Sequence, residues 1–149
     1  MIKLINHTVI DTAKDIYRVF QVSYPYEAKL LGVTSFPPLN RTTTDFQEST
    51  TLFYGFYEGV ELAAVMELDV NKNYTLIRSL IVDPDFFRKG IASKLVQYAI
   101  ENDTTTKVLV ETGNANIPAK TLYIKHNFIE EKVWMTDFGI EKVGYVLMK

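Results

Sequence analysis

The residues that most clearly suggest chemistry are Arg88-Lys89-Gly90. They follow an apolar run, Leu76–Val82, that has the composition of a buried strand and that Pro84 ends, because proline lacks the N–H of a strand ladder. From Ile91 onward, apolar residues recur at three- and four-residue spacing, which predicts a helix. Free N–H groups and the helix dipole at such a helix start attract anions. The stretch therefore predicts a site for a phosphate or pyrophosphate.

This signal is weak in isolation. One glycine and two basic residues at a helix start also occur in an ordinary turn with a solvated basic pair, and the local pattern alone favours that interpretation. The stretch lacks the Gly-x-x-x-x-Gly-Lys-Ser/Thr pattern of phosphate-binding loops, and it has one glycine where the dinucleotide fingerprint has three. A nucleotide-phosphate-binding protein is therefore disfavoured.

The composition is that of an ordinary globular chain. The 149 residues suit a single domain spanning 1–149, with 47% hydrophobic residues and a net charge of −2. The charge does not favour nucleic acid as a partner. There is no cysteine, which excludes disulfides, thiolate catalysis and cysteine metal sites, and two histidines are too few for a metal site of their own. No membrane-spanning run and no signal peptide are recognised, so we expect a cytoplasmic protein that does not bind membranes.

The order of predicted elements indicates an α+β fold. We expect a mixed, mostly antiparallel twisted sheet of about six to seven strands flanked by about four helices. The first helix is expected to start near Thr8 and to end at about Ser23, before Pro25, with a second short helix or irregular turn over Tyr24–Gly32. A strand, a helix and a strand between Tyr74 and Glu111 should form a right-handed crossover with its two strands parallel. The expected strands are Ile2–Ile5, Thr51–Tyr57, Val60–Val70, Tyr74–Val82, Lys107–Glu111, Glu130–Phe138 and Val143–Met148.

Two motifs together resemble those of the GNAT superfamily of N-acetyltransferases. The stretch from Val82 through Arg88-Lys89-Gly90 to Val96 is similar to its acyl-CoA motif, Gln/Arg-x-x-Gly-x-Gly/Ala. Downstream, Glu111 and then Asn116-x-x-Ala-x-x-Leu-Tyr123 followed by Asn127-Phe128 match the family's second pattern. Phe87 stands where Gln or Arg is usual, and Asn127 replaces a glycine. The resemblance covers nearly the whole chain and implies a parallel strand pair splayed around acyl-CoA.

The resemblance also implies roles for individual residues. Tyr123 would be the general acid that protonates the departing thiolate, with a core aromatic residue as the alternative. Glu111 would be the general base, directly or through water, or else a strand-end carboxylate that pairs locally; Glu67 and Asp69 are weaker candidates. Asn116 would bind the pantetheine arm or cap its helix. The residues implied in acetyl-CoA binding are Leu80, Ile81, Val82, Arg88, Lys89, Gly90, Ile91, Ala92, Ser93, Asn116 and Tyr123.

The expected activity is transfer of an acetyl group from acetyl-CoA, as cosubstrate and without a metal, to a primary amine by direct attack in a ternary complex. The alternative is a non-catalytic acyl-CoA-binding regulatory module. The acceptor stays open between a small molecule and a peptide N-terminus. A homodimer is among the open oligomeric states. By the resemblance, Tyr24, Tyr26, Glu27, Leu31, Phe36 and Trp134 would line the acceptor cleft, although helix packing is the interpretation that we favour for most of them.

Overall fold

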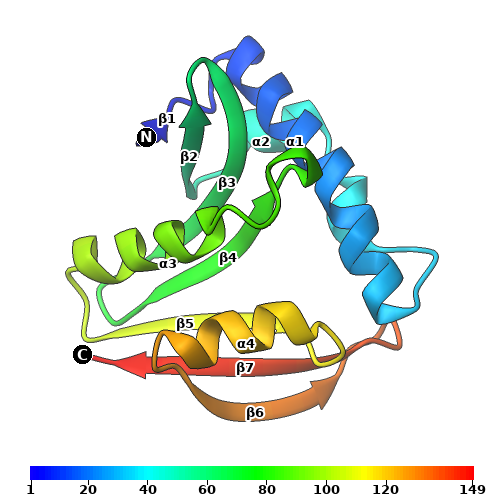
Figure 1. Ribbon diagram of the computed structural model, residues 1–149, viewed down its shortest axis with the longest axis vertical. Coiled ribbons are helices and arrows are strands. Elements are labelled where there is room, and N and C mark those ends of the chain that lie inside the picture. The colour runs from blue at the N-terminus through cyan, green and yellow to red at the C-terminus, as the bar shows by residue number, and fades with distance from the viewer.

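Seven strands form one sheet in the computed structural model, which describes residues 1–149 (Figure 1). The strand order is β1-β2-β3-β4-β5-β7-β6, and β4 and β5 are the one parallel pair of neighbours. The predicted α+β fold with a mixed sheet is confirmed. The strands are β1 Ile2–Ile5, β2 Leu52–Glu58, β3 Glu61–Val70, β4 Thr75–Val82, β5 Lys107–Gly113, β6 Ile129–Met135 and β7 Glu141–Met148. The helices are α1 Ile10–Leu31, α2 Thr43–Glu48, α3 Ile91–Asn102 and α4 Ile117–Lys125, with short 3-10 helices at Pro37–Asn40 and Pro84–Phe86.

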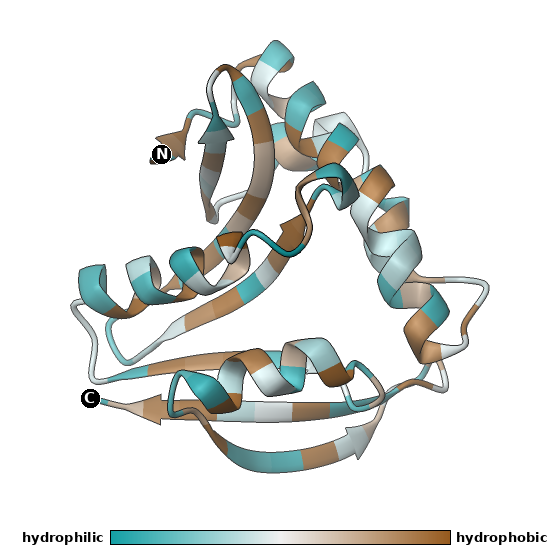
Figure 2. Ribbon diagram, viewed as in Figure 1, coloured by the Kyte–Doolittle hydropathy of each residue, from teal (hydrophilic) through white to brown (hydrophobic).

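Helices cover the sheet on both faces, and each face has its own apolar core. One core gathers α3 and α4 side chains, such as Leu95 and Tyr123, on the strands. The other gathers α1 and α2 side chains, such as Phe20 and Phe46, on β2 to β4. In Figure 2, hydrophobic residues run along β4 and β5, while α1 and α3 alternate between hydrophobic and hydrophilic segments. This alternation is typical of helices with one buried face.

The first helix corrects two predictions. It does not end near Ser23 but continues through Pro25 to Leu31, so the second short helix expected over Tyr24–Gly32 does not exist separately. Proline removes one helical hydrogen bond, but Tyr24 and Ala28 on either side of it are buried against the sheet and prolong the same apolar stripe. The helix also begins later than predicted, after Val9, with no side-chain cap.

Other local predictions agree more closely with the structure. Thr42 caps α2 and forms a capping box with Asp45. Asn116 caps α4 by accepting a hydrogen bond from the backbone N–H of Ala119. Asn127 adopts the left-handed conformation after α4, with φ of 70°. These signals are local, which explains why the sequence reveals them.

The parallel pair separates part of the way along. Pairing between β4 and β5 stops at Ile77, which lies opposite Val110. Arg78 is an extra residue in the β3–β4 ladder, where Glu67 lies opposite Ser79 and Leu68 opposite Ile77. Such a bulge bends a strand and increases its twist. In Figure 1, β4 and β5 diverge beyond this point, and α1 crosses the open end.

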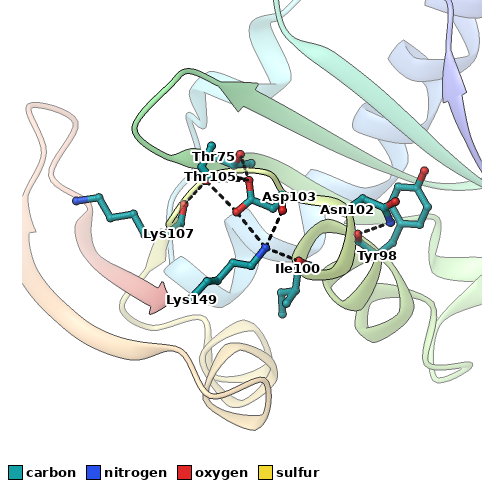
Figure 3. A network of polar contacts seen from close by, with 8 residues as sticks. All are labelled: Thr75, Tyr98, Ile100, Asn102, Asp103, Thr105, Lys107 and Lys149. Carbon is teal, nitrogen blue, oxygen red and sulfur yellow. Dashed lines mark hydrogen bonds and ion pairs between the residues drawn. The ribbon is translucent and has the colours of Figure 1, made fainter.

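The opposite end of the parallel pair is held together by Asp103, which follows α3 (Figure 3). Its carboxylate accepts hydrogen bonds from Thr75 at the start of β4 (2.7 Å) and from Thr105 just before β5 (2.8 Å). Lys149, at the end of the chain, donates to the main-chain oxygen of Asp103 at 2.8 Å. Burial alone would raise the pKa of Asp103, but these hydrogen bonds and the Lys149 charge hold it below its usual value. The cluster joins β4, α3, β5 and the C-terminus at the closed end of the pair.

None of the helices combines the length and the hydropathy needed to span a bilayer.

Candidate functional site

A cleft of about 920 Å³ opens where β4 and β5 separate. Its walls come from α1, β4, the turn before α3, the first turn of α3, the end of β5 and α4. Beyond Ile77, β4 pairs only with β3. The other edge of residues 79–82 has no strand partner and borders the cleft. A free strand edge offers N–H and C=O groups to an extended ligand.

The turn at the start of α3 has the features of an anion site. Gly90 precedes the helix with φ of 73°, and Arg88 has φ of 63°, although it is not a glycine. None of the backbone hydrogen bonds outside the helices and strands has a donor between Arg88 and Ser93. Six consecutive N–H groups at the positive end of α3 therefore remain for a ligand, as a pyrophosphate would require.

Nearly all residues predicted to bind the cosubstrate line this cleft. The exception is Lys89, whose ammonium group lies over the ring of Phe86 at 5.2 Å from the ring centre. Phe87, which departs from the motif, is 41% exposed and packs edge-on against Tyr26 of α1, with 5.4 Å between ring centres. The predicted residues that line the cleft are Leu80, Ile81, Val82, Arg88, Gly90, Ile91, Ala92, Ser93, Asn116 and Tyr123, together with Glu111.

Tyr123 on α4 is almost entirely buried, at 4% exposure, yet its hydroxyl reaches the cleft. No hydrogen bond to this hydroxyl exists within the protein, and no fully buried side-chain polar atom lacks a partner. The oxygen must therefore be accessible from the cleft that the residue lines. Burial, with the nearby Glu27 and Tyr24, raises the pKa of Tyr123 above its usual range, so the phenol stays protonated. It can donate a hydrogen bond to a group in the cleft.

Glu27 forms a contact that sequence reasoning missed. Its Oε1 accepts hydrogen bonds from Asn116 Nδ2 at 3.0 Å and from Thr112 Oγ1 at 3.4 Å, and no partner exists for Oε2. Burial raises the pKa of Glu27 and outweighs these hydrogen bonds and the charge of Lys142, which lower it. The sequence assigned Glu27 only to the wall of an acceptor cleft. Its position in the helical pattern of α1, on the buried side with Tyr24, was the available signal.

Gly113 explains how α1 comes so close to β5. A Cβ at this position would collide with a methyl carbon of Leu31, far inside contact distance. Leu31 is one helical turn after Glu27, so the turn of α1 that carries Glu27 lies close to the end of β5. The absence of a side chain at Gly113 thus helps to bring the α1 carboxylate to the open end of the split.

A second cavity of about 470 Å³ adjoins the first on the side of α1 and the loop after β6. Tyr123 and Asn116 line only the first cleft. Seven residues line both cavities and mark the place where they meet: Tyr24, Glu27, Ile77, Arg78, Ser79, Glu111 and Thr112. The arrangement can hold two ligands with their reactive ends at the split.

The other predicted carboxylates differ in their surroundings. Glu111 is exposed at the end of β5, opposite Gly144 of β7, and it lines both cavities. Glu67 is fully buried and forms a two-pronged ion pair with Arg41, at 2.7 and 3.1 Å. Burial would raise the pKa of Glu67, but hydrogen bonds from Arg41 and two hydroxyls hold it below its usual value. Glu67 and Asp69 line neither cavity, so both are poorly placed to act as a base.

The two histidines lie apart, and no group of three potential metal ligands forms. His7 contacts the carbonyl oxygen of Ser49 at 2.8 Å. His126, after α4, lies 2.8 Å from the hydroxyl of Ser93 in the first turn of α3, so it links the two helices that border the cleft. Trp134 of β6, predicted in the acceptor cleft, lines neither cavity.

Comparison with solved structures identifies the same fold in several acetyltransferases. The ribosomal-protein-S18-alanine N-acetyltransferase from Escherichia coli superposes with a TM-score of 0.78 at 18% identity, covering 99% of this chain and 92% of that one. A Bacillus subtilis acetyltransferase in complex with CoA has a TM-score of 0.72 at 20% identity, covering 99% and 97%. A GNAT acetyltransferase from Elizabethkingia anophelis with acetyl-CoA bound has a TM-score of 0.68 at 16% identity, covering 89% and 90%.

A sequence relative is considerably longer than this chain. The UPF0157 protein YqkA of Bacillus subtilis is 33% identical over 129 residues, which are 86% of this chain but 38% of that protein. The chain therefore spans well under half of the curated relative that it matches. The model of the acetyltransferase (GNAT) family matches residues 13–128. With this match over most of its length and the fold described above, the chain belongs to the GNAT acetyltransferase family.

Proposed function

We propose that this chain transfers an acetyl group from acetyl-CoA to a primary amine by direct attack in a ternary complex. The observation that carries the proposal is the meeting of two cavities at the split between β4 and β5, with Tyr123 in one and Glu27 shared by both. Two ligands, one in each cavity, can meet there. No cysteine is available to form an acyl-enzyme, which favours direct attack.

The larger cleft suits acetyl-CoA. The free edge of β4 from Ser79 to Val82 can pair with the amide groups of the pantetheine arm, as an added strand would. The free N–H groups between Arg88 and Ser93 and the dipole of α3 can bind the pyrophosphate. Phe87 offers no polar contact, so the backbone and the Arg88 charge supply the binding of this group. Lys89, predicted in this set, can contribute only at longer range.

In the proposed reaction, the amine nitrogen forms a bond to the thioester carbonyl carbon, and the carbon–sulfur bond breaks. The sulfur leaves as a thiolate that accepts a proton from the Tyr123 hydroxyl. Burial raises the pKa of Tyr123, so the phenol starts the reaction protonated, and the tyrosinate left by the transfer regains a proton from solvent before the next cycle. A backbone N–H of the free β4 edge would stabilise the negative charge on the carbonyl oxygen.

The amine must lose a proton, and two carboxylates at the junction can accept it. Glu111, the base predicted from sequence, is exposed at the end of β5, where it can act through water. Glu27 is more enclosed, has a free Oε2, and has a pKa raised by burial, which brings its basicity closer to that of an amine. We assign the larger part of the base function to Glu27. Glu111 would accept the proton through water on the solvent-exposed side of the junction.

The direct test measures CoA thiol release from acetyl-CoA with a panel of primary amines, beside acetyl-CoA binding by calorimetry. We expect binding and amine-dependent thiol release. Tight binding without release on any amine would support instead the non-catalytic acyl-CoA-binding module. No binding of acetyl-CoA would contradict both functions.

A further inference from the structure

The second cavity carries an inference about the acceptor, which rests on the acetyl transfer proposed above. Its volume of about 470 Å³ falls within the ~300–1,000 Å³ of typical small-molecule sites. It meets the acetyl-CoA cleft at Glu27 and Glu111, and Tyr123 does not line it. An acceptor bound in this cavity would place its amino group at the junction, near the thioester. The remainder of the acceptor would stay inside the second cavity.

One wall of this cavity is aromatic and apolar. Phe20, Tyr24 and Phe36 form a continuous cluster, with 5.2 Å between the ring centres of the first two and 5.5 Å between those of the last two. The cavity also reaches Phe138, which is 68% exposed in the loop between β6 and β7, and the buried Ile140. Such a wall binds an apolar or aromatic side chain.

The charged residues of the cavity are nearly balanced. Three cations line it, but Arg41 is neutralised by the buried Glu67 through its two-pronged ion pair. Arg78 has only a 3.9 Å contact with Asp69, between side chains that are 57% and 49% exposed, which is worth little. Lys142 forms no ion pair, and no ion pair joins Glu27 or Glu111 to a cation. Two carboxylates and two available cations therefore face the same space.

A cavity that has both unpaired carboxylates and unpaired cations is complementary to a ligand that has both a positive and a negative group. We propose that the acceptor is a zwitterionic amine, a free α-amino acid with an apolar or aromatic side chain. Its amino group binds at Glu27, its carboxylate binds at Lys142 and Arg78, and its side chain packs on the aromatic wall. A polyamine would bring several positive charges toward Arg78 and Lys142, and a simple amine would leave both cations without a partner.

The first experiment compares three acceptors with the same amine and ring: L-phenylalanine, L-phenylalaninamide and phenethylamine, with spermidine as a polycation. Thiol release from acetyl-CoA is followed at fixed pH. We expect kcat/KM for phenylalanine to exceed that of the other three by at least ~10-fold, the loss of one charge-assisted contact. The amino group of phenylalaninamide is less basic than that of phenylalanine, so a larger fraction of it is neutral and reactive. This difference alone would favour the amide, so a higher kcat/KM for phenylalanine cannot come from it.

The second experiment removes the proposed carboxylate contact. Lys142→Met keeps most of the length of the side chain and removes its charge. We expect KM for phenylalanine to rise about tenfold more than KM for the amide does, because only phenylalanine has a carboxylate that loses its contact. Lys132→Met is the matched control, because Lys132 lies over Trp134 on the neighbouring strand and lines neither cavity. Arg78→Met should act in the same direction as Lys142→Met.

The outcomes separate this proposal from the one beneath it. Equal use of phenylalanine and its amide, a Lys142→Met effect on both alike, or release with spermidine alone would overturn the amino-acid acceptor and leave acetyl transfer standing. No release with any amine, despite acetyl-CoA binding, would overturn the proposed activity and the acceptor with it. Selective use of phenylalanine that disappears in Lys142→Met but not in Lys132→Met supports both.

Discussion

Glu27 of α1 accepts a hydrogen bond from the side-chain amide of Asn116, with 3.0 Å between Oε1 and Nδ2, although 89 residues separate them in sequence. Asn116 at the same time caps α4 through its Oδ1, which accepts from the N–H of Ala119. One side chain thus orients both the carboxylate at the junction of the cavities and the helix that carries Tyr123. This contact couples the two sides of the proposed reaction.

Tyr123→Phe should lower kcat by roughly 100-fold, the lower end of the range for a lost general acid, because the leaving thiolate would have no proton donor. The dissociation constant of acetyl-CoA should stay within about twofold, since the ring remains in place. Thiol-release kinetics and calorimetry measure the two quantities. Tyr145→Phe is the control, since its ring packs 6.1 Å from that of Tyr123 in the core but lines neither cavity. Unchanged turnover in Tyr123→Phe would contradict the acid role.

Glu27→Gln should reduce kcat by roughly 100-fold, because the side-chain amide of glutamine cannot accept the proton of the amine. Glu111→Gln should reduce kcat less. A base works only when ionised, and burial raises the pKa of Glu27. The activity of the native chain should therefore fall as pH decreases through a value above the usual ~4.3 of a glutamate. That limb of the pH profile should persist in Glu111→Gln. If Glu111→Gln abolishes it and Glu27→Gln does not, Glu111 is the base.

Gly113→Ala should destabilise the fold by about 1–3 kcal/mol, the usual cost of overpacking, because its Cβ would collide with Leu31. We also expect lower kcat, since α1 must shift and carry Glu27 away from Thr112. Leu31→Ala in the same chain should restore both quantities in part, by removing the colliding methyl groups. Thermal unfolding and thiol release of both single variants and the double variant measure this coupling. Strictly additive effects would show that the two positions act independently.

Asp103→Asn should lower the free energy of unfolding at pH 7 by about 1–3 kcal/mol, because Thr75, Thr105 and Lys149 lose a charged acceptor. The pKa of Asp103 is depressed in the folded chain, so its contribution is complete above the unfolded pKa of ~3.9 and disappears as pH falls through the lower folded value. The difference between native and variant should therefore shrink in acid. Denaturant unfolding at several pH values measures it, with the exposed Asp137→Asn as control. A pH-independent difference would contradict this account.

Local signals in the sequence determined much of the site. The apolar run, the break at Pro84 and the basic turn before Ile91 together predicted a strand, a turn and a helix, and the structure has all three in order. The same holds for Asn116 as a cap, and Asn127, which replaces the glycine of the motif, has a left-handed backbone. These features depend on residues within a few positions of each other, where backbone preferences and hydrogen bonds act directly.

Only the tertiary structure decided how the two halves of the sheet meet. The bulge at Arg78 depends on the pairing of β4 with β3, and the continuity of α1 through Pro25 depends on the burial of Tyr24 and Ala28. The place of Glu27 depends on contacts with Thr112 and Asn116, more than eighty residues away. Long-range packing outweighs local propensity at such positions, because the free energy of burial exceeds the cost of one lost helical hydrogen bond. The sequence by itself therefore determined the family and the local elements around the candidate site, whereas the arrangement of carboxylates at the split required the fold.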